Sequence, residues 1–139
     1  MQKHKFVYYI TVVISMLVGL WHFFVPQMFQ WYDYLPMQHT NLIVGIDYTN
    51  YCFSFLLFGL SLLLIILGRK ALSMDKEVII FYLFLTVVWV FRASLATFIE
   101  PWPLEPVPAA AIGQLVASDC LAILMCFISI NFLLNLKKQ

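Results

Sequence analysis

The sequence predicts an all-α protein, a four-transmembrane-helix bundle, and three observations lead to this fold class. The first is composition, because 63% of the 139 residues are hydrophobic, 11% are charged and the mean hydropathy is +0.92. Soluble domains average about a quarter charged residues, and a chain of this size cannot hide so large an apolar fraction from water. The second observation is a set of four long apolar runs, and the third is the distribution of positive charge between them.

The same composition excludes two other classes of protein. Disorder requires low hydrophobicity and high net charge, and a nucleic-acid binder should show a basic excess. Here eight Lys and Arg residues stand against seven Asp and Glu residues, which gives a net charge of +1. We therefore expect the lipid bilayer as the surrounding partner and no nucleic acid.

Each apolar run is long enough for a transmembrane helix, which needs about 20 mostly apolar residues. We predict spans at about residues 6–25, 48–67, 78–98 and 111–134, in a single domain that covers residues 1–139. The runs lack the alternation of a lipid-facing barrel strand. The first run is too long for a cleaved signal peptide and no small-residue cleavage site follows it.

Prolines, a glycine and charges mark the ends of these runs. Pro26 follows the first run, and Gly68-Arg69-Lys70 is predicted to break the chain after the second. Proline suits the first turn of a helix, and a group of prolines precedes the fourth run. These are Pro101, Pro103, Pro106 and Pro108.

Seven of the eight basic residues fall in three segments that four crossings place on one side of the membrane. They are Lys3, Lys5, Arg69, Lys70, Lys76, Lys137 and Lys138. The other side carries only acidic charges, which are Asp33, Asp47, Glu100 and Glu105. Because positive charge collects in cytoplasmic loops, the N- and C-termini are predicted to be cytoplasmic.

Two charges lie deep within predicted spans, and we expect them to form an ion pair. At about 1.5 Å per residue, Arg92 lies about 9 Å and Asp119 about 12 Å below the outer ends of consecutive antiparallel helices. Pairing relieves the cost of burying both charges. A purely structural pair that locks two helices is an equal alternative, and Arg92 could instead extend upward to Glu100.

His22 lies about one turn from the outer end of the first run, where three roles are open. It could relay a proton, contact a lipid headgroup or bind a metal, or it could be an interfacial histidine bonded to a loop carbonyl. No second histidine lies at a matching depth for haem, and no paired His/Cys spacing suggests zinc. We expect no metal site.

Polar residues follow helical spacing on the second run and on the fourth. Asp47, Asn50, Tyr51 and Ser54 form one stripe, which Ser61 extends. Asp47 could be only an N-cap, and interhelical hydrogen bonding is the alternative for the others. The comparable stripe on the fourth run combines small and polar residues, which are Ala111, Gln114, Ser118, Asp119 and Ala122.

These polar groups are predicted to lie in the outer half of the bilayer, above an inner half made almost entirely of Leu, Ile, Val and Phe. This asymmetry favours a polar pocket that opens outward or into the outer leaflet, and it argues against a continuous ion path. Cys52, Cys120 and Cys126 also fall within spans without a CxxC spacing, so we expect buried, inert thiols.

The stretch Gly19-Leu20-Trp21-His22-Phe23-Phe24-Val25-Pro26, followed by Phe29 and by Tyr34-Leu35-Pro36, resembles the start of the DoxX-like small four-helix membrane proteins. Gly59-Leu60-Ser61-Leu62-Leu63-Leu64 resembles the end of their second helix. The resemblance covers about the first half of the chain. Asp47-Tyr48-Thr49-Asn50 stands where that family often has Ser-Gly and a glutamate, so any role of that glutamate does not carry over.

The resemblance implies a four-helix bundle in the bacterial plasma membrane and a partnership with quinone-linked redox complexes. Our leading hypothesis is a pocket that binds an amphipathic, quinone- or lipid-like molecule, in a protein that acts alone, as a homo-oligomer or as an accessory subunit. The alternatives are an enzyme acting on lipid or quinol with His22 as acid/base, and a purely structural subunit. No cofactor is evident apart from the quinone. The candidate site residues are His22, Asp47, Asn50, Tyr51, Arg92, Gln114, Ser118 and Asp119.

Overall fold

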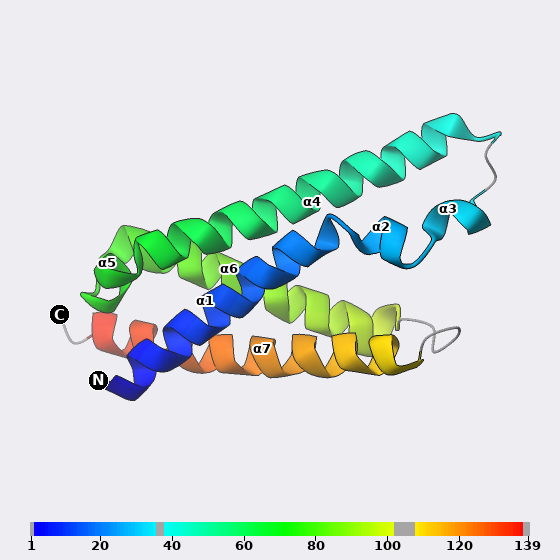
Figure 1. Cartoon of the computed structure of the whole chain (residues 1–139). Coiled ribbons are helices and arrows are strands. Elements are labelled where there is room, and N and C mark those ends of the chain that lie inside the picture. Colours follow the sequence, from blue (N-terminus) through cyan, green and yellow to red (C-terminus); the bar gives the residue numbers. More distant parts are fainter. Residues whose placement is uncertain (1, 36–37, 102–107, 138–139) are drawn as a thin grey trace. The chain divides into compact units, whose positions relative to one another are not determined.

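The computed structural model describes residues 2–35, 38–101 and 108–137, and every regular element within them is a helix (Figure 1). Four helices are long and apolar enough to cross a membrane, which confirms the all-α class and the number of predicted spans. They cover His4–His22, Thr40–Ile66, Lys76–Ile99 and Ala111–Leu136. Several residues used in the sequence analysis lie outside the described part of the chain, namely Pro36, Pro103, Glu105, Pro106 and Lys138.

The chain divides into two compact units, which we describe separately. The central unit is Val12–Ile66, and it holds most of α1 (Gln2–His22), α2 (Val25–Met28), α3 (Trp31–Tyr34) and α4 (Thr40–Ile66). The terminal unit combines Met1–Thr11 with Leu67–Gln139. It holds the start of α1, α5 (Gly68–Leu72), α6 (Lys76–Ser94), the π-helix η1 (Leu95–Ile99) and α7 (Pro108–Leu136). The single domain over residues 1–139 stays a prediction.

The end of the first span and the start of the second differ from those predicted. Helix α1 ends at His22, where Phe23 N donates to Leu20 O at 3.3 Å and Phe24 N donates to Trp21 O at 2.9 Å. Pro26 then lies in the first turn of α2, where its missing N–H leaves no bond unmade. Helix α4 begins at Thr40 rather than at residue 48. Asp47 therefore lies inside the helix, and the N-cap role proposed for it is wrong.

The predicted end of the second span just before Gly68-Arg69-Lys70 is confirmed, because α4 ends at Ile66 and these three residues begin a separate short helix, α5. The chain turns after α5 at Met74, which has φ 70° in the left-handed region that usually favours glycine. Asp75 then caps α6, since its carboxylate accepts from Glu77 N at 3.1 Å and from Val78 N at 3.3 Å. An aspartate N-cap thus places the start of the third span.

In the central unit, the backbones of α1 and α4 lie close together at Gly19. A Cβ atom at this position would lie 2.5 Å from Phe58 N and 2.9 Å from Phe58 Cα, so only glycine fits. Nearer the end of α4, the Ser61 and Ser15 hydroxyl oxygens lie 2.8 Å apart in a buried hydrogen bond between the same two helices. Small residues therefore let these helices meet backbone to backbone, as in other membrane helix pairs.

In the terminal unit, α6 and α7 lie side by side (Figure 1), and the start of α1 contacts α6 through aromatic rings. Tyr8 stacks on Tyr82 at 5.0 Å between ring centroids, and Phe132 on α7 meets the two rings edge to face at 6.1 and 5.5 Å. Thr11 Oγ1 lies 3.1 Å from Tyr82 Oη in a buried hydrogen bond. Such aromatic pairs are favourable beyond the area that they bury.

The predicted apolar half of the spans, next to the chain termini, is not apolar. Thr11, Ser15, Ser61, Thr86 and Ser129 are buried there, and the Thr86 and Ser129 hydroxyls lie 2.8 Å apart. Several of these hydroxyls also donate to a carbonyl of their own helix, as Ser61 does to Leu57 O at 2.7 Å. Because a hydroxyl can be satisfied in this way, serine and threonine enter an apolar helix at any depth. The predicted polar asymmetry is therefore wrong.

We predict that Gly19→Ala lowers the free energy of unfolding by about 1–3 kcal/mol, the usual cost of overpacking a close contact. Gly59→Ala is the matched control on α4, because nothing lies within 4 Å of a Cβ atom there. Thermal unfolding in detergent, followed by circular dichroism, compares the two. Equal melting temperatures for the two variants would contradict the close approach at Gly19.

Candidate functional site

The eight predicted site residues fall into two groups, one in each unit, and each group is described by itself. Arg92, Gln114, Ser118 and Asp119 belong to the terminal unit, and the other four belong to the central unit.

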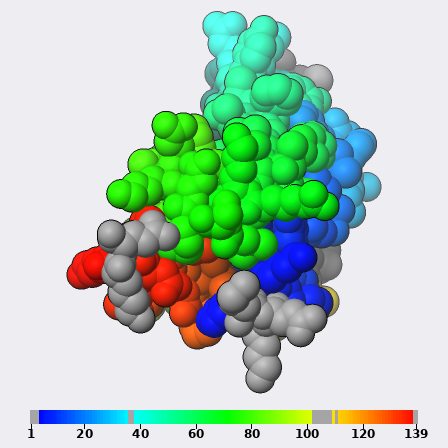
Figure 2. Space-filling model, turned by 90° about the vertical axis from the view of Figure 1, so that its left-hand side faces the viewer, coloured from blue at the N-terminus to red at the C-terminus, as the bar shows by residue number. Residues whose placement is uncertain are grey.

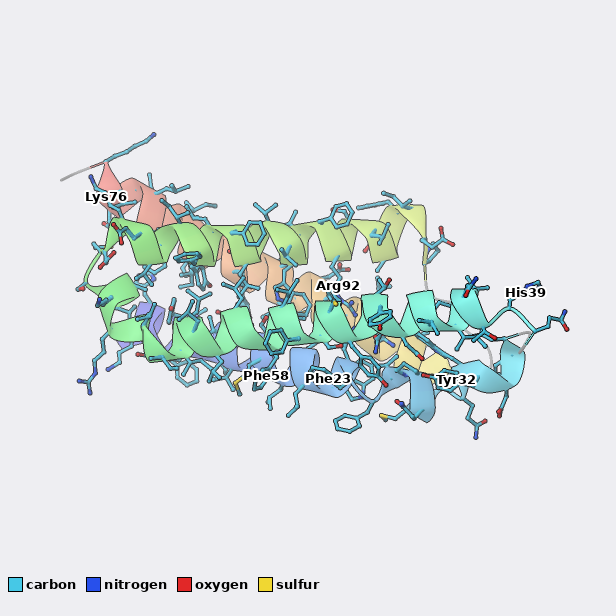
Figure 3. The ribbon with its side chains drawn as sticks, turned by 90° about the horizontal axis from the view of Figure 1, so that it is seen from above. Phe23, Tyr32, His39, Phe58, Lys76 and Arg92 are labelled. Carbon is cyan, nitrogen blue, oxygen red and sulfur yellow. The ribbon has the colours of Figure 1, made fainter. Side chains whose placement is uncertain are left out.

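In the terminal unit, Arg92 brings together polar side chains from α6 and α7. We call Trp89, Arg92, Gln114 and Ser118 the arginine cluster. Arg92 is half-buried on α6 (Figure 3), its Nε donates to Ser118 Oγ at 3.4 Å, and its Nη2 donates to Gln114 Oε1 at 3.5 Å. Gln114 and Ser118 face the same way because they lie four residues apart on one helix.

The cluster has an aromatic wall and a buried donor without a described acceptor. The Arg92 guanidinium carbon lies 5.7 Å from the centroid of the Trp89 ring, and Trp89 is only 2% exposed. This distance suits a cation–π interaction. Gln114 Nε2 is buried and has no hydrogen-bond partner among the described residues. An amide left in this state costs about 1–3 kcal/mol.

The predicted ion pair between Arg92 and Asp119 is not formed. The Asp119 carboxylate instead accepts from Thr97 Oγ1, at 3.2 Å to one oxygen and 3.4 Å to the other. The helical repeat explains this, because Asp119 is turned about 100° from Ser118, which faces Arg92. Among the described residues, Glu100 does not pair with Arg92 either, and it is exposed.

Asp119 lines a different feature, an open groove of about 600 Å³ along α6, η1 and α7. Its walls are mainly apolar, with Val90, Ile123 and Phe127 among them, and Thr97 lies beside the carboxylate. The sequence analysis predicted one site for Arg92 and Asp119 because residue counts give the depth of each side chain in the membrane. They do not give the side of the helix from which each side chain points. The structure assigns the two residues to different surroundings.

In the central unit, His22 is held by its own helix and by rings. Its side chain is 8% exposed, and Nδ1 donates to Val18 O at 2.8 Å. The ring meets Trp21 edge to face at 5.2 Å and Phe53 at 5.5 Å. The alternative prediction for His22 was a hydrogen bond to a loop carbonyl. The structure shows a hydrogen bond to a backbone carbonyl, but that carbonyl belongs to α1.

The polar stripe on α4 connects that helix to other parts of the central unit. Asn50 Nδ2 donates to His22 O at 2.9 Å, and Asp47 accepts from Tyr32 Oη of α3 at 2.6 Å. Tyr51 is exposed, and its ring stacks on Phe23 at 6.2 Å between centroids. Since these contacts run between elements of one unit, they support interhelical packing, the structural alternative for this stripe.

Sequence reasoning missed the buried hydroxyls of the terminus-side half. A signal for them was present on α1, where Tyr8, Thr11 and Ser15 follow the helical spacing i, i+3, i+7. The expectation of buried thiols is wrong for two cysteines, because Cys52 and Cys120 are exposed and Cys126 is half-buried. These three thiols are free.

Within the described ranges, no three His, Cys, Asp or Glu side chains gather into a group that could hold a metal ion. Comparison of the chain with protein-family models, with curated proteins and with solved structures finds no match. The resemblance to DoxX-like proteins therefore stays a prediction.

Tyr32 lies outside the membrane-spanning helices, and its hydrogen bond to the Asp47 carboxylate raises its pKa to about 12. The ordinary tyrosine pKa is about 10. We predict that this hydrogen bond contributes fully to stability below pH 10 and is lost as the pH rises through about 12. The absorbance of tyrosinate, taken as the difference between the wild type and Tyr32→Phe, measures this titration.

Asp47→Asn should bring the titration of Tyr32 back toward pH 10, because the amide carries no negative charge. Tyr34→Phe is the control, since Tyr34 is 74% exposed. A wild-type titration of Tyr32 near pH 10 would show that the Tyr32–Asp47 bond does not form in solution.

Proposed function

We propose that this chain binds an amphipathic molecule, quinone- or lipid-like, and holds a carbonyl or anionic oxygen of that molecule at the arginine cluster. The observation that carries the proposal is the buried Gln114 Nε2, which has no acceptor among the described residues and lies on the amide whose oxygen accepts from Arg92. A ligand oxygen that accepts from this amide would remove the cost of leaving it unsatisfied.

The chemistry of the cluster selects the class of ligand. Guanidinium and amide nitrogens are donors, so the group bound must be an acceptor such as a quinone carbonyl, a carboxylate or a phosphate. The contacts from Arg92 to Ser118 and Gln114, at 3.4 and 3.5 Å, are at the long limit of hydrogen bonding. A ligand oxygen can therefore compete for these donors.

The position of the cluster selects the rest of the ligand. Arg92 and Gln114 both lie within membrane-spanning helices, and a group that reaches them through lipid must be mostly apolar. Trp89 is buried beneath the guanidinium and helps to hold Arg92 in place. Of the eight candidate site residues, we keep Arg92, Gln114 and Ser118 as proposed binding residues. The residues of the central unit are better explained as helix packing.

The distribution of lysine and arginine supports a finer proposal about topology. With seven of eight basic residues on the side of the termini, we propose that both termini are cytoplasmic, which places the arginine cluster in the outer half of the bilayer. The resemblance to DoxX-like proteins supports a bacterial plasma membrane, and a role as an accessory subunit of a redox complex or as a homo-oligomer.

Binding of a short-chain benzoquinone to the protein in detergent, followed by quenching of tryptophan fluorescence, tests the proposal. We predict that Arg92→Gln weakens binding about tenfold or more, because a hydrogen bond from a charged donor contributes about 1.5–3 kcal/mol. Gln114→Leu should weaken it to a smaller extent, and Arg92→Lys should retain part of the affinity. An alkyl carboxylate and an alkyl phosphate serve as further probes.

Arg69→Gln is the matched control, because Arg69 is exposed on α5 and away from the cluster in sequence. The melting temperature of each variant separates loss of binding from loss of folding. The proposal fails if the wild type binds none of the three probes, or if folded Arg92→Gln binds as the wild type does. Stability lost in Arg92→Gln with no probe bound by the wild type would instead favour a structural role.

A further inference from the structure

A second cavity lies in the terminal unit, at the end of the chain's helices where both termini are found. Its volume is about 290 Å³, and residues from the start of α1, from α5 and the turn after it, and from the last turns of α7 line it. Figure 2 looks onto this end of the molecule, with the start of α1 in blue and the end of α7 in red. No residue of the arginine cluster lines the cavity.

The walls of this cavity are apolar. Leu72 of α5 and Ile128 and Phe132 of α7 supply them. Ile128 and Phe132 are 1% and 6% exposed, so both are fixed parts of the core rather than mobile surface side chains. An apolar hollow of this kind accepts a hydrocarbon chain in preference to water.

The lining also includes basic and amide side chains. His4 and Lys5 come from the first turns of α1, and Asn131 and Asn135 come from α7. The His4 ring stacks on Phe127 at 5.7 Å, and its Nδ1 is buried with no hydrogen-bond partner. In the described part of the chain, no carboxylate pairs with Lys5. The cavity therefore combines a cation and an unsatisfied imidazole with apolar walls.

We propose that this cavity binds an anionic amphiphile, with the hydrocarbon chain against Leu72, Ile128 and Phe132 and the acidic headgroup at His4 and Lys5. The site lies at the ends of membrane-spanning helices, which is the depth of lipid headgroups. Basic pockets between such helices are known to hold acidic lipid headgroups. A zwitterionic lipid fits less well, because its own ammonium group would approach Lys5.

The experiment uses the full chain in nanodiscs of phosphatidylcholine with added phosphatidylglycerol, and native mass spectrometry counts the lipids that stay bound. We expect phosphatidylglycerol to be retained over phosphatidylcholine. Lys5→Gln should reduce this retention about fivefold, the ratio that corresponds to about 1 kcal/mol per basic residue near a membrane surface. Lys76→Gln is the matched control, because Lys76 is exposed and does not line the cavity.

A second variant and a cross-link locate the lipid. Asn135→Trp should displace it by filling the cavity from its exposed rim. A photoreactive phosphatidylglycerol should label Leu72, Ile128 or Phe132. Sodium oleate added to the mixed phosphatidylcholine and phosphatidylglycerol nanodiscs distinguishes the sources. Oleate that displaces phosphatidylglycerol identifies a fatty acid as a ligand as well, and oleate that does not displace it restricts the site to phospholipid.

Three results would overturn the proposal. They are equal retention of the two phospholipids with no oleate bound, an equal effect of Lys5→Gln and Lys76→Gln, and cross-links that fall outside the cavity. Circular dichroism of each variant confirms that it is folded. If Lys5→Gln fails to fold, Asn135→Trp and the position of the cross-link in the wild type decide the question.

Discussion

In an apolar span, a polar group without a hydrogen-bond partner is costly, because there is no water to take the partner's place. Much of this structure follows from that constraint. The Thr86 and Ser129 hydroxyls meet between α6 and α7, and Ser15 and Ser61 meet between α1 and α4. Asn50 Nδ2 donates to His22 O, the last carbonyl of α1. Each of these bonds satisfies a polar group and also fixes the register of two helices.

The same constraint draws attention to the few groups that the described residues leave unsatisfied. Gln114 Nε2 and His4 Nδ1 are buried without partners. Gln114 lies beside Arg92 within the spans, and His4 and Lys5 line the same cavity at the helix ends. Each place combines an unsatisfied nitrogen with a basic residue, so an acidic or carbonyl oxygen suits both. The two sites differ in their depth in the membrane. The arginine cluster needs an oxygen that an apolar molecule carries into the span, and the cavity needs an acidic headgroup at the membrane surface.

Sequence reasoning gave the polar residues of the spans with their depth but not their direction. Arg92 and Asp119 were expected to pair because their helices are consecutive and their depths match. Their direction depends on how α6 and α7 are rotated about their axes, and that rotation turns Ser118 toward Arg92 and Asp119 toward Thr97. Asp47 was misjudged for a related reason. The start of α4 at Thr40 lies in a mixed polar and apolar segment that does not mark a helix end.

By itself, the sequence determined the class of the protein. Four apolar runs of this length can satisfy their backbone hydrogen bonds in lipid as transmembrane helices. The sequence also determined that polar groups would be buried between those helices, since Ser, Asn, Gln and Arg interrupt the runs. Only the tertiary structure decided which of them meet. Gly19 against Phe58, Tyr82 against Thr11 and Gln114 against Arg92 are contacts between distant parts of the chain. These contacts depend on the rotation and spacing of whole helices. Packing determines that rotation and spacing, and the order of residues in one helix does not reveal it.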